Sequence, residues 1–380
     1  MANTFLTPDV IAREALMLLE NNLVAANLVY RDHETEFTGA RVGDTITIRR
    51  PANFQVDEFS NEINVQDVNE QGVPLTLDKH YDISVGITSR QLTLELESFS
   101  EQIVAPAMIN LAEKVDSYIY GLARHIPTVV GRPGETPWHL KDLSYVDAKL
   151  LDQKVPMRGR VGLVGSAFKA EMLGIDAVAR ADARGDEGTA LREASMGRVM
   201  GIDWYGVQGV QSHTAGTASG EAGLATSSAA SAGDTTVALT TGGSGSETIV
   251  KGDVLRIEGS GEYVATADVT ASSGSFSAVP IYPALRSDVA SGTGVTVVND
   301  HTMNVAGHPR GISLAVVPLQ LPMEAGRGAT ISNRGLSIRV VMGYDQKAKS
   351  DTISFDLLVG GHVTQPELLT RFIGPQAEAS

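Results

Sequence analysis

The sequence predicts an α+β fold that carries a separate small all-β domain. Three patterns support this prediction: an apolar stripe with the period of a helix over residues 98–126, alternating apolar residues before and after it, and an abrupt shift to small residues near 213. At 380 residues the chain exceeds a typical single domain, so two or more units are expected. The 39 glycines and 5% aromatic residues favour many turns and much β structure.

A long helix is expected over residues 98–126. Ser98 and Glu101 have the spacing of a capping box, which marks a helix start. Apolar residues then recur at intervals of three and four for about eight turns, a rod of roughly 40 Å. Pro106 lacks a backbone donor, so a bend or a later start is expected there. The pattern also suits an ordinary long core helix. The stripe consists of Ile103, Val104, Ala107, Met108, Leu111, Ala112, Val115, Ile119, Leu122, Ala123 and Ile126.

Residues 1–40 begin with a helix signal. Thr7, Pro8 and Asp9 supply an N-cap, a proline at the first helical position and an acid in the first turn. The sequence after this short amphipathic helix carries little apolar surface, so we expect an arm that packs on something else. The first helix of a larger core is the alternative.

Between Arg41 and Leu96 the apolar period changes to two, which predicts strands at Thr45–Ile48 and from Leu75 onward. The connection between them is acidic and has no lysine or arginine, so it is not core. A two-stranded ribbon is poorly stable alone in water, and it therefore needs a neighbour to lie on. A solvated loop is the alternative for the acidic tip. Its acids are Asp57, Glu58, Glu62, Asp67 and Glu70.

From Pro133 to Gln211 the pattern is mixed α/β. A helix over 145–155, a strand over 160–164 and a helix capped by Ser166 are expected, followed by a strand-like stretch over 197–210. The strand, Gly165 and Ser166 could suggest a nucleophile elbow, but Phe168 takes the place of the second glycine. We therefore interpret Ser166 as a helix cap.

The stretch 214–248 holds 29 Gly, Ala, Ser or Thr among its 35 residues, so an insert begins there. Short alternating runs follow at even spacing, which predicts a small antiparallel barrel or sandwich. A flexible linker is the alternative for 214–232. The runs are Thr235–Leu239, Val254–Ile257, Tyr263–Val269, Phe276–Ile281 and Val295–Val298. Strands at 312–321, 336–342 and 352–359 and a short helix or strand at 366–373 are expected to follow.

Composition and motifs exclude several classes of function. The net charge of −15 and pI near 5.0 argue against a protein that grips nucleic acid. Without cysteine there are no disulfides or thiolate metal sites, and none of the eight histidines is three or four residues from another. No P-loop and no G-x-G-x-x-G after a strand occurs, and the carboxylates are scattered. We expect neither an enzyme nor a cofactor or metal.

No signal peptide and no apolar run long enough to span a membrane is present, so use in the cytoplasm is expected.

Taken in order, these segments resemble the major capsid protein of tailed bacteriophages, the HK97-like fold, in its P22-like branch with an inserted β domain. The segments LTPDVIAREALMLLENNLV, RVGDTITIRRP, GLSIRVVMGYD and DTISFDLLVGGHVTQPELLTRFIG look typical of that branch. The resemblance covers nearly the whole chain and rests on several moderate matches in the right order. It implies an N-terminal arm at 1–40, an extended loop at 41–97, a peripheral domain with the spine helix at 98–130 and 345–380, an axial domain at 131–212 and 301–344, and an inserted β-barrel or Ig-like domain at 213–300.

The resemblance implies assembly and not catalysis. Copies would form hexamers and pentamers of an icosahedral shell around double-stranded DNA held without sequence-specific binding, with a scaffolding protein and a portal as partners and no membrane. The protein would be made in the host bacterial cytoplasm and used in the virion capsid. The extended loop would lie across a neighbouring subunit, where the five acids of its tip would meet Arg49, Arg50 and Arg90 of an adjacent copy. Such exposed pairs contribute about 0 to 1 kcal/mol each and set register more than affinity.

The sequence also fits two other classes of protein. The shell protein of an encapsulin-type nanocompartment shares the fold and encloses an enzyme, and a β-rich surface adhesin is a third reading that the missing signal peptide opposes. The insert would either brace the subunit during folding or contact neighbouring capsomers. Lys79 is the lysine to suspect for an isopeptide cross-link of the kind some relatives form, although no asparagine can be assigned as its partner.

Overall fold

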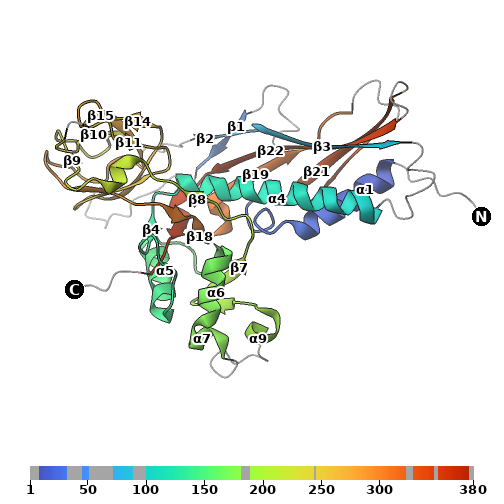
Figure 1. Cartoon of the computed structure of the whole chain (residues 1–380), viewed down its shortest axis with the longest axis horizontal. Coiled ribbons are helices and arrows are strands. Elements are labelled where there is room, and N and C mark those ends of the chain that lie inside the picture. Colours follow the sequence, from blue (N-terminus) through green and yellow to red (C-terminus); the bar gives the residue numbers. More distant parts are fainter. Residues whose placement is uncertain are drawn as a thin grey trace, which may run out of the picture. The chain divides into compact units, whose positions relative to one another are not determined.

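The computed structural model describes residues 8–31, 45–50, 72–88, 100–180, 189–243, 245–321, 328–345 and 350–375 (Figure 1). The chain divides into two compact units. Unit 1 comprises Met1–Val115 and Ile312–Gln365, and unit 2 comprises Asp116–Gly311 and Pro366–Ser380. Helix α4, Ala105–Leu122, therefore begins in unit 1 and ends in unit 2.

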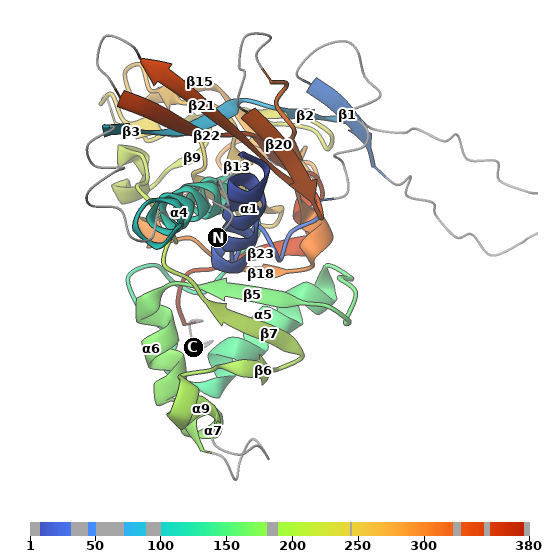
Figure 2. The ribbon, with the colours of Figure 1, turned by 90° about the vertical axis from the view of Figure 1, so that its right-hand side faces the viewer.

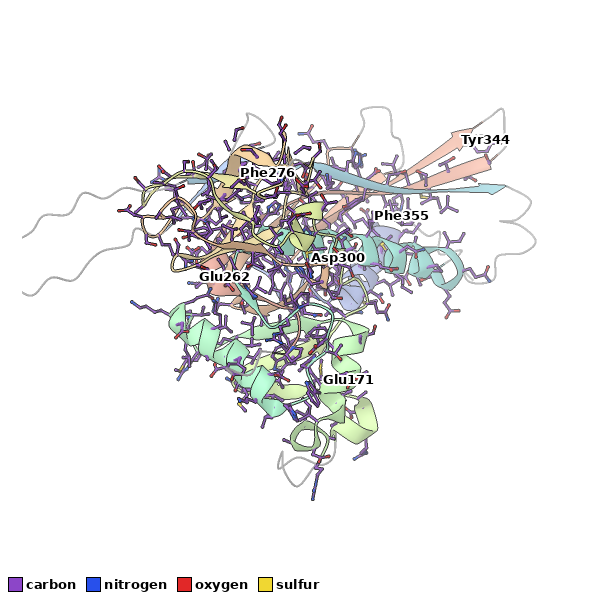
Figure 3. The ribbon with its side chains drawn as sticks, turned by 60° about the vertical axis from the view of Figure 1, so that its left-hand side comes forward. Glu171, Glu262, Phe276, Asp300, Tyr344 and Phe355 are labelled. Atoms are coloured by element: carbon purple, nitrogen blue, oxygen red, sulfur yellow. The ribbon has the colours of Figure 1, made fainter. Side chains whose placement is uncertain are left out.

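Unit 1 is built on an antiparallel sheet around its longest strand, β22, Ser350–Val363. Strand β22 pairs with β3 (Lys79–Thr88), β21 (Leu336–Asp345) and β19 (Ile312–Val317), and β20 (Gly328–Asn333) pairs with β21. Because side chains alternate along a strand, Val340, Phe355 and Ile83 share one apolar face. Tyr344 lies toward the far end of β21, where it is 56% exposed (Figure 3).

Two helices cover the apolar face of this sheet. Helix α1, Pro8–Asn22, buries Ile11, Leu16 and Leu19 and lies against β20 and β21. Figures 1 and 2 show α1 and the first turns of α4 on the same side of the sheet. The helix predicted from Pro8 is therefore present, whereas its proposed cap, Thr7, lies outside the described residues.

The predicted apolar stripe is the buried face of α4. Every stripe residue from Val104 to Ile126 is buried. A π-helical turn, η1 (Ser100–Val104), precedes α4, and a 3₁₀ turn, η2 (Ala123–His125), follows it. The α-helix begins one residue before Pro106, the first turn being where a missing donor costs nothing. Ser98 lies outside the described residues.

The expected long ribbon is shorter than predicted. Strand β1, Thr45–Arg49, pairs with β2, Gly72–Thr76. Strand β3 instead makes ten consecutive antiparallel pairs with β22. The alternating residues after 78 belong to the body of unit 1, because their apolar side chains share the helix-covered face with those of β22. Alternation alone could not reveal this partner.

In unit 2 a six-stranded mixed sheet has the order β4-β23-β18-β5-β7-β6. Its strands are β4 (Val129–Val130), β23 (Leu369–Phe372), β18 (Asn304–Gly307), β5 (Val161–Val164), β7 (Ile202–Gly206) and β6 (Gly197–Val199). Its helices are α5 (Leu140–Asp152), α6 (Ser166–Gly174), α7 (Asp176–Ala179) and α9 (Thr189–Glu193). The rings of Phe168 and Phe372 meet edge-on at 5.3 Å in the core between α6 and the sheet.

Ser166 is not the cap of its helix. Gly165 occupies the N-cap position without a side-chain hydrogen bond, and Ser166 is the first helical residue. The N–H of Gly165 donates to Asn304 Oδ1 at 2.8 Å, while Asn304 Nδ2 donates to the carbonyl of Phe372 at 3.0 Å. Asn304, an amide distant in sequence, thus fixes the turn between β5 and α6.

The insert is a small β-barrel within unit 2. Six antiparallel strands follow the order β16-β12-β13-β15-β10-β9, and a bridge between Ala225 and Gly294 joins the two ends of the sheet. The all-β insert expected from sequence is therefore present, and its 214–232 segment contains a 3₁₀ turn and a strand. The elements are η3 (Thr217–Gly220), β9 (Ala225–Thr226), β10 (Thr236–Thr240), β11 (Thr248–Ile249), β12 (Val254–Ile257), β13 (Gly261–Ala265), β14 (Val269–Thr270), β15 (Ser275–Tyr282) and β16 (Val295–Val297).

A two-stranded neck carries the barrel. It consists of β8, Ser212–His213, paired with β17, His301–Thr302. Two short 3₁₀ turns, η4 (Pro309–Gly311) and η5 (Pro366–Leu368), complete the unit.

Strand pairing groups the C-terminal segments differently from the expected domains. Residues 312–344, expected in the axial domain, belong to unit 1, because β19 and β21 both pair with β22. Residues 366–375, expected in the peripheral domain, belong to unit 2, because β23 pairs with β18 and β4. The domain boundaries of the assembled form stay a prediction.

Candidate assembly surface

The structure describes only part of the predicted contact set. Arg49 ends β1 and is exposed, and Arg50 follows it half-buried. The remaining predicted contact residues, Asp57, Glu58, Glu62, Asp67, Glu70 and Arg90, lie outside the described residues. Their pairing across copies stays a prediction.

The β1–β2 ribbon has one apolar and one polar face. Ile46 lies opposite Leu75, and the fully buried Leu75 packs on Ala315 of β19. On the other face the hydroxyls of Thr45 and Thr76 lie 2.9 Å apart. The base of the ribbon is thus anchored on its own unit, and its polar face is left outward.

Gly360 makes this anchoring possible. A Cβ at Gly360 would overlap the carbonyl oxygen of Thr76 and crowd Leu77. A larger residue in this part of β22 would push the ribbon base away from the sheet.

Strand β3 is an edge strand over the part of the chain that the structure describes, since β22 is its single pairing partner there. Its apolar residues Tyr81, Ile83 and Val85 are only half-buried. On the opposite face His80, Asp82 and Ser84 are exposed. The edge therefore offers both backbone hydrogen-bonding groups and incompletely covered apolar side chains.

Two carboxylates lie side by side on the polar face. Asp356 is directly opposite Asp82 on β3 and opposite Arg339 on β21. Arg339 donates to Asp356 Oδ2 through Nη2 at 2.6 Å and through Nε at 2.9 Å. The Ser354 hydroxyl donates to Asp82 at 2.7 Å. Arg339 therefore neutralises Asp356, while Asp82 is held by serine hydroxyls.

Asp82 is held in its charged form. Burial alone would raise its pKa, but hydrogen bonds from Ser354 and Ser84, together with the charge of His80, outweigh burial and lower the pKa of this carboxyl. Asp82 thus presents a negative charge on the exposed face of the sheet.

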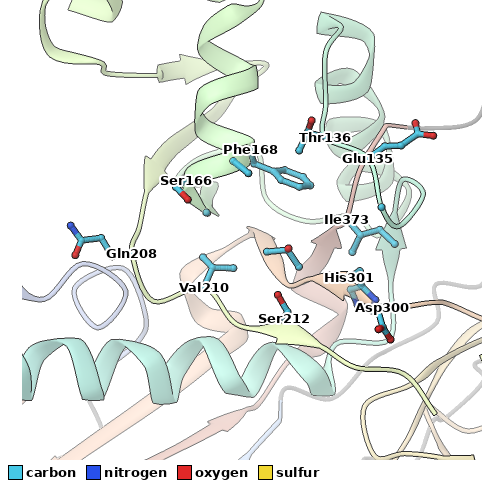
Figure 4. Close-up of a pocket in the computed structure, with 14 residues that line it drawn as sticks. Glu135, Thr136, Ser166, Phe168, Gln208, Val210, Ser212, Asp300, His301 and Ile373 are labelled. Carbon is cyan, nitrogen blue, oxygen red and sulfur yellow. The ribbon is translucent and has the colours of Figure 1, made fainter. Parts of the chain in front are cut away.

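Unit 2 contains a cavity of about 490 Å³ at the start of α6 (Figure 4). Ser166 and Phe168 of α6, Ser212 and His301 of the neck, and Val210 point toward it. His301 Nδ1 lies 2.7 Å from the carbonyl of Asn299 and Nε2 lies 3.3 Å from Arg371 Nη1. With both ring nitrogens engaged, His301 is unavailable to activate Ser166. This cavity lacks the geometry of a serine hydrolase.

Beneath the cavity lies a buried polar cluster at the base of the barrel. His213 Nε2 contacts Asp253 Oδ1 at 2.8 Å, and Asp253 also accepts from the backbone of Val250. The fully buried Arg371 donates to the carbonyls of Gly252, at 3.1 Å, and Arg124. Burial lowers the pKa of Arg371 to about 9, against the raising effect of Asp253, so the guanidinium stays charged at neutral pH. Arg371 therefore joins strand β23, the η2 turn after α4 and the barrel at one point.

Burial also changes the titration of His301. It lowers the pKa of His301 to about 4; Arg371 and His213 act in the same direction, while the Asn299 carbonyl and Asp253 oppose them. The tautomer follows from the contacts: Nδ1 donates to Asn299, so Nε2 accepts from Arg371.

The described ranges contain neither a metal site nor a membrane-spanning helix. Within them no cluster of three or more histidine, aspartate or glutamate side chains is placed to hold a metal ion. No helix among those residues is long and apolar enough to cross a membrane.

Sequence reasoning missed the Asp82–Asp356 pair and the Arg371 cluster. Both depend on contacts between residues that are far apart in sequence: Asp82 with Ser354, and Arg371 with Gly252. The available signal was weak: a charged residue inside an apolar run, as for Asp356 in SFDLLV and Arg371 in LLTRFIG.

No family model matches the sequence, and no curated protein matches it. Solved phage structures resemble the fold. A chain of Mycobacterium phage Che8 aligns with a TM-score of 0.54 at 16% identity, covering 92% of this chain and 90% of that chain. The capsid of cyanophage P-SCSP1u gives 0.49 at 9% identity, covering 88% and 85%, and that of Ralstonia phage GP4 gives 0.47 at 7%, covering 89% and 86%.

The fold is the HK97-like fold of phage capsid proteins, an α+β architecture, here with an inserted small all-β domain. The long helix and a two-stranded ribbon were expected in this class, and the ribbon is shorter than expected because β3 pairs with β22. Membership of the P22-like branch stays a prediction.

Proposed function

We propose that this chain is a major capsid protein whose copies assemble into the icosahedral shell that encloses a phage genome. The HK97-like fold along nine-tenths of the chain supports this proposal most directly. A subunit surface with unfinished elements supports it further: an edge strand of ten residues and a ribbon whose strands have open outer edges among the described residues.

The shell is built from hexamers and pentamers of the same chain. The ribbon reaches from its anchor on β19 to a neighbouring subunit, where the tip acids Asp57, Glu58, Glu62, Asp67 and Glu70 meet Arg49, Arg50 and Arg90. A scaffolding protein and a portal are the expected assembly partners. Synthesis takes place in the host bacterial cytoplasm, and the mature protein resides in the virion.

The genome is held without sequence-specific contacts. A net charge of −15 repels DNA at long range, so packaged DNA does not adhere to the shell while it enters. No step of this function requires catalysis or a cofactor.

The barrel acts as a brace within unit 2. Besides the Arg371 cluster, Glu262 of β13 accepts from Lys149 of α5 at 2.9 Å and from the backbone of Val129 at 3.2 Å. Val254 and Val298 of the insert pack with Val129 and Ile373. These contacts support a bracing role over that of a loosely attached appendage.

The nanocompartment shell is the second candidate, because it shares the fold. Particles released from infected cells separate the two: nuclease-resistant double-stranded DNA inside them supports a phage capsid, and an enclosed enzyme with no DNA supports a compartment. Protein that stays monomeric under all assembly conditions contradicts both.

A further inference from the structure

The second half of β3, residues 83–88, lacks the features that normally protect an exposed edge strand. Edge strands are usually blunted by charges, proline or bulges, because their free backbone groups invite pairing. Residues 83–88, ISVGIT, contain neither charge nor proline, and the pairing of β3 with β22 runs without a register shift. Lys79, His80 and Asp82 lie in the first half of β3, so the second half is the part of this edge that is open to a further strand.

Strand β1 has matching properties. It pairs with β2 alone among the described strands, and Thr45–Ile48 are all β-branched residues of high strand propensity. Its side chains alternate as those of β3 do, with Ile46 and Ile48 on the apolar face and Thr45, Thr47 and Arg49 on the polar face.

We propose that the β1 edge of one copy pairs with the β3 edge of another, so that the ribbon of one subunit extends the β22 sheet of the next. The proposal rests on the proposed shell function and names its contact. With apolar faces aligned, Ile46 and Ile48 cover the half-exposed Ile83 and Val85. Backbone hydrogen bonds supply affinity, and the alternating side chains supply register.

Charge complementarity supports this occupant. On the polar face of the sheet, Arg339 neutralises Asp356, whereas Asp82 beside it is held by the hydroxyls of Ser84 and Ser354. Arg49 lies on the polar face of β1 and brings a second guanidinium to this pair. Its arrival balances two carboxylates with two arginines.

The contact is heterologous, because β1 and β3 are different surfaces. Each copy gives one edge and receives another, and such head-to-tail contacts close into rings when the rotation allows. Ring formation is what hexamers and pentamers require.

Cross-linking between copies tests the pairing. The chain has no cysteine, so copies with Thr47→Cys can be co-assembled with copies carrying Ser84→Cys and treated with a short bismaleimide. Both positions are exposed, and only contacts between copies yield covalent dimers. The matched control replaces Ser84→Cys with Ser332→Cys, an exposed position on β20, the far strand of the same sheet.

Dimers in the first mixture and none in the control support the pairing. Intact particles without dimers, or with equal dimers in both mixtures, overturn it and leave the shell function standing. Sedimentation measures particle formation independently of cross-linking. If the wild-type protein forms no particles, the shell function is rejected, and this contact is rejected with it.

Charge reversal gives a second test. Arg49→Asp and Asp82→Arg are each expected to reduce particle yield about tenfold or more, because each places like charges together at the contact. In the Asp82→Arg variant the new guanidinium lies beside the carboxylate of Asp356, so the subunit is expected to fold. The double variant is expected to restore particles. Folded single variants that assemble normally, or a folded double variant that does not recover, contradict the contact.

Discussion

Arg371 Nη1 donates to the carbonyl oxygen of Gly252 at 3.1 Å, which joins strand β23 to the inserted barrel through a fully buried guanidinium. The same side chain reaches the carbonyl of Arg124 and Nε2 of His301. One residue near the C-terminus therefore holds three segments that are far apart in sequence.

Replacing Arg371 should destabilise unit 2. Arg371→Leu removes the donors of buried acceptors and the cation near Asp253, a loss of about 3–5 kcal/mol in the free energy of unfolding. Urea denaturation followed by circular dichroism measures it. Arg198→Leu, whose side chain is 59% exposed and 3.9 Å from Asp203, is the matched control and should change stability by less than about 0.5 kcal/mol. Equal effects of the two variants would show that the cluster does not fasten the barrel.

Acidification should weaken the same cluster. Burial lowers the pKa of His301 to about 4 from an ordinary 6.5, so between these values the unfolded chain binds more protons than the folded one. Stability should therefore fall as pH drops from 6.5 toward 4, by on the order of 3 kcal/mol in total. Urea midpoints measured across this range give the slope.

His301→Gln removes the titration and keeps an acceptor for Arg371. Its midpoint should depend less on pH than that of the wild-type protein. A variant with an unchanged slope would assign the acid sensitivity to other groups. Asp82 is not one of them, because its lowered pKa affects stability only near and below pH 4.

Gly360 should tolerate no side chain. A Cβ there overlaps the carbonyl oxygen of Thr76, so Gly360→Ala should cost about 1–3 kcal/mol or displace the ribbon base. Gly343→Ala, on the neighbouring strand β21 with open space around its Cβ, is the control and should be near neutral. Hydrogen exchange of 72–76 in the isolated subunit reports displacement. Protection unchanged from wild type at unchanged stability would mean that the ribbon is not anchored there.

The Glu262 contacts should determine how firmly the barrel is held. Glu262→Ala leaves Lys149 and the N–H of Val129 without their shared acceptor, a cost of about 1–3 kcal/mol. Limited proteolysis should then cut the neck faster than in the wild-type protein. Glu258→Ala, an exposed acid on the same barrel, should leave the cleavage rate unchanged, and similar rates for both variants would argue against the brace.

The period of the apolar residues predicted those helices and strands whose sequence pattern does not depend on which element they pack against. Helices α1 and α4 and the strand runs of the barrel follow from spacing alone, because one buried face fixes their pattern. Strand β3 also showed its alternation, yet its pairing with β22 instead of β1 is a contact across more than 260 residues. No local pattern encodes that choice.

Part of the candidate assembly surface could be predicted from the sequence, and part could not. The ribbon and Arg49 were visible as an alternating run that ends in a charge. The Asp82–Asp356 pair was not, because it exists only when β3 and β22 are in register. Ser166 looked like a cap because serine favours that position, whereas the turn is held by Asn304 from another strand.

Electron cryomicroscopy of the purified protein after assembly shows whether copies of this chain close into a shell. We expect hollow closed particles of uniform size, built from rings in which the ribbon of each subunit lies on the β22 sheet of a neighbour. Isolated subunits that form no closed particles, with residues 45–76 packed entirely within their own chain, would contradict this expectation.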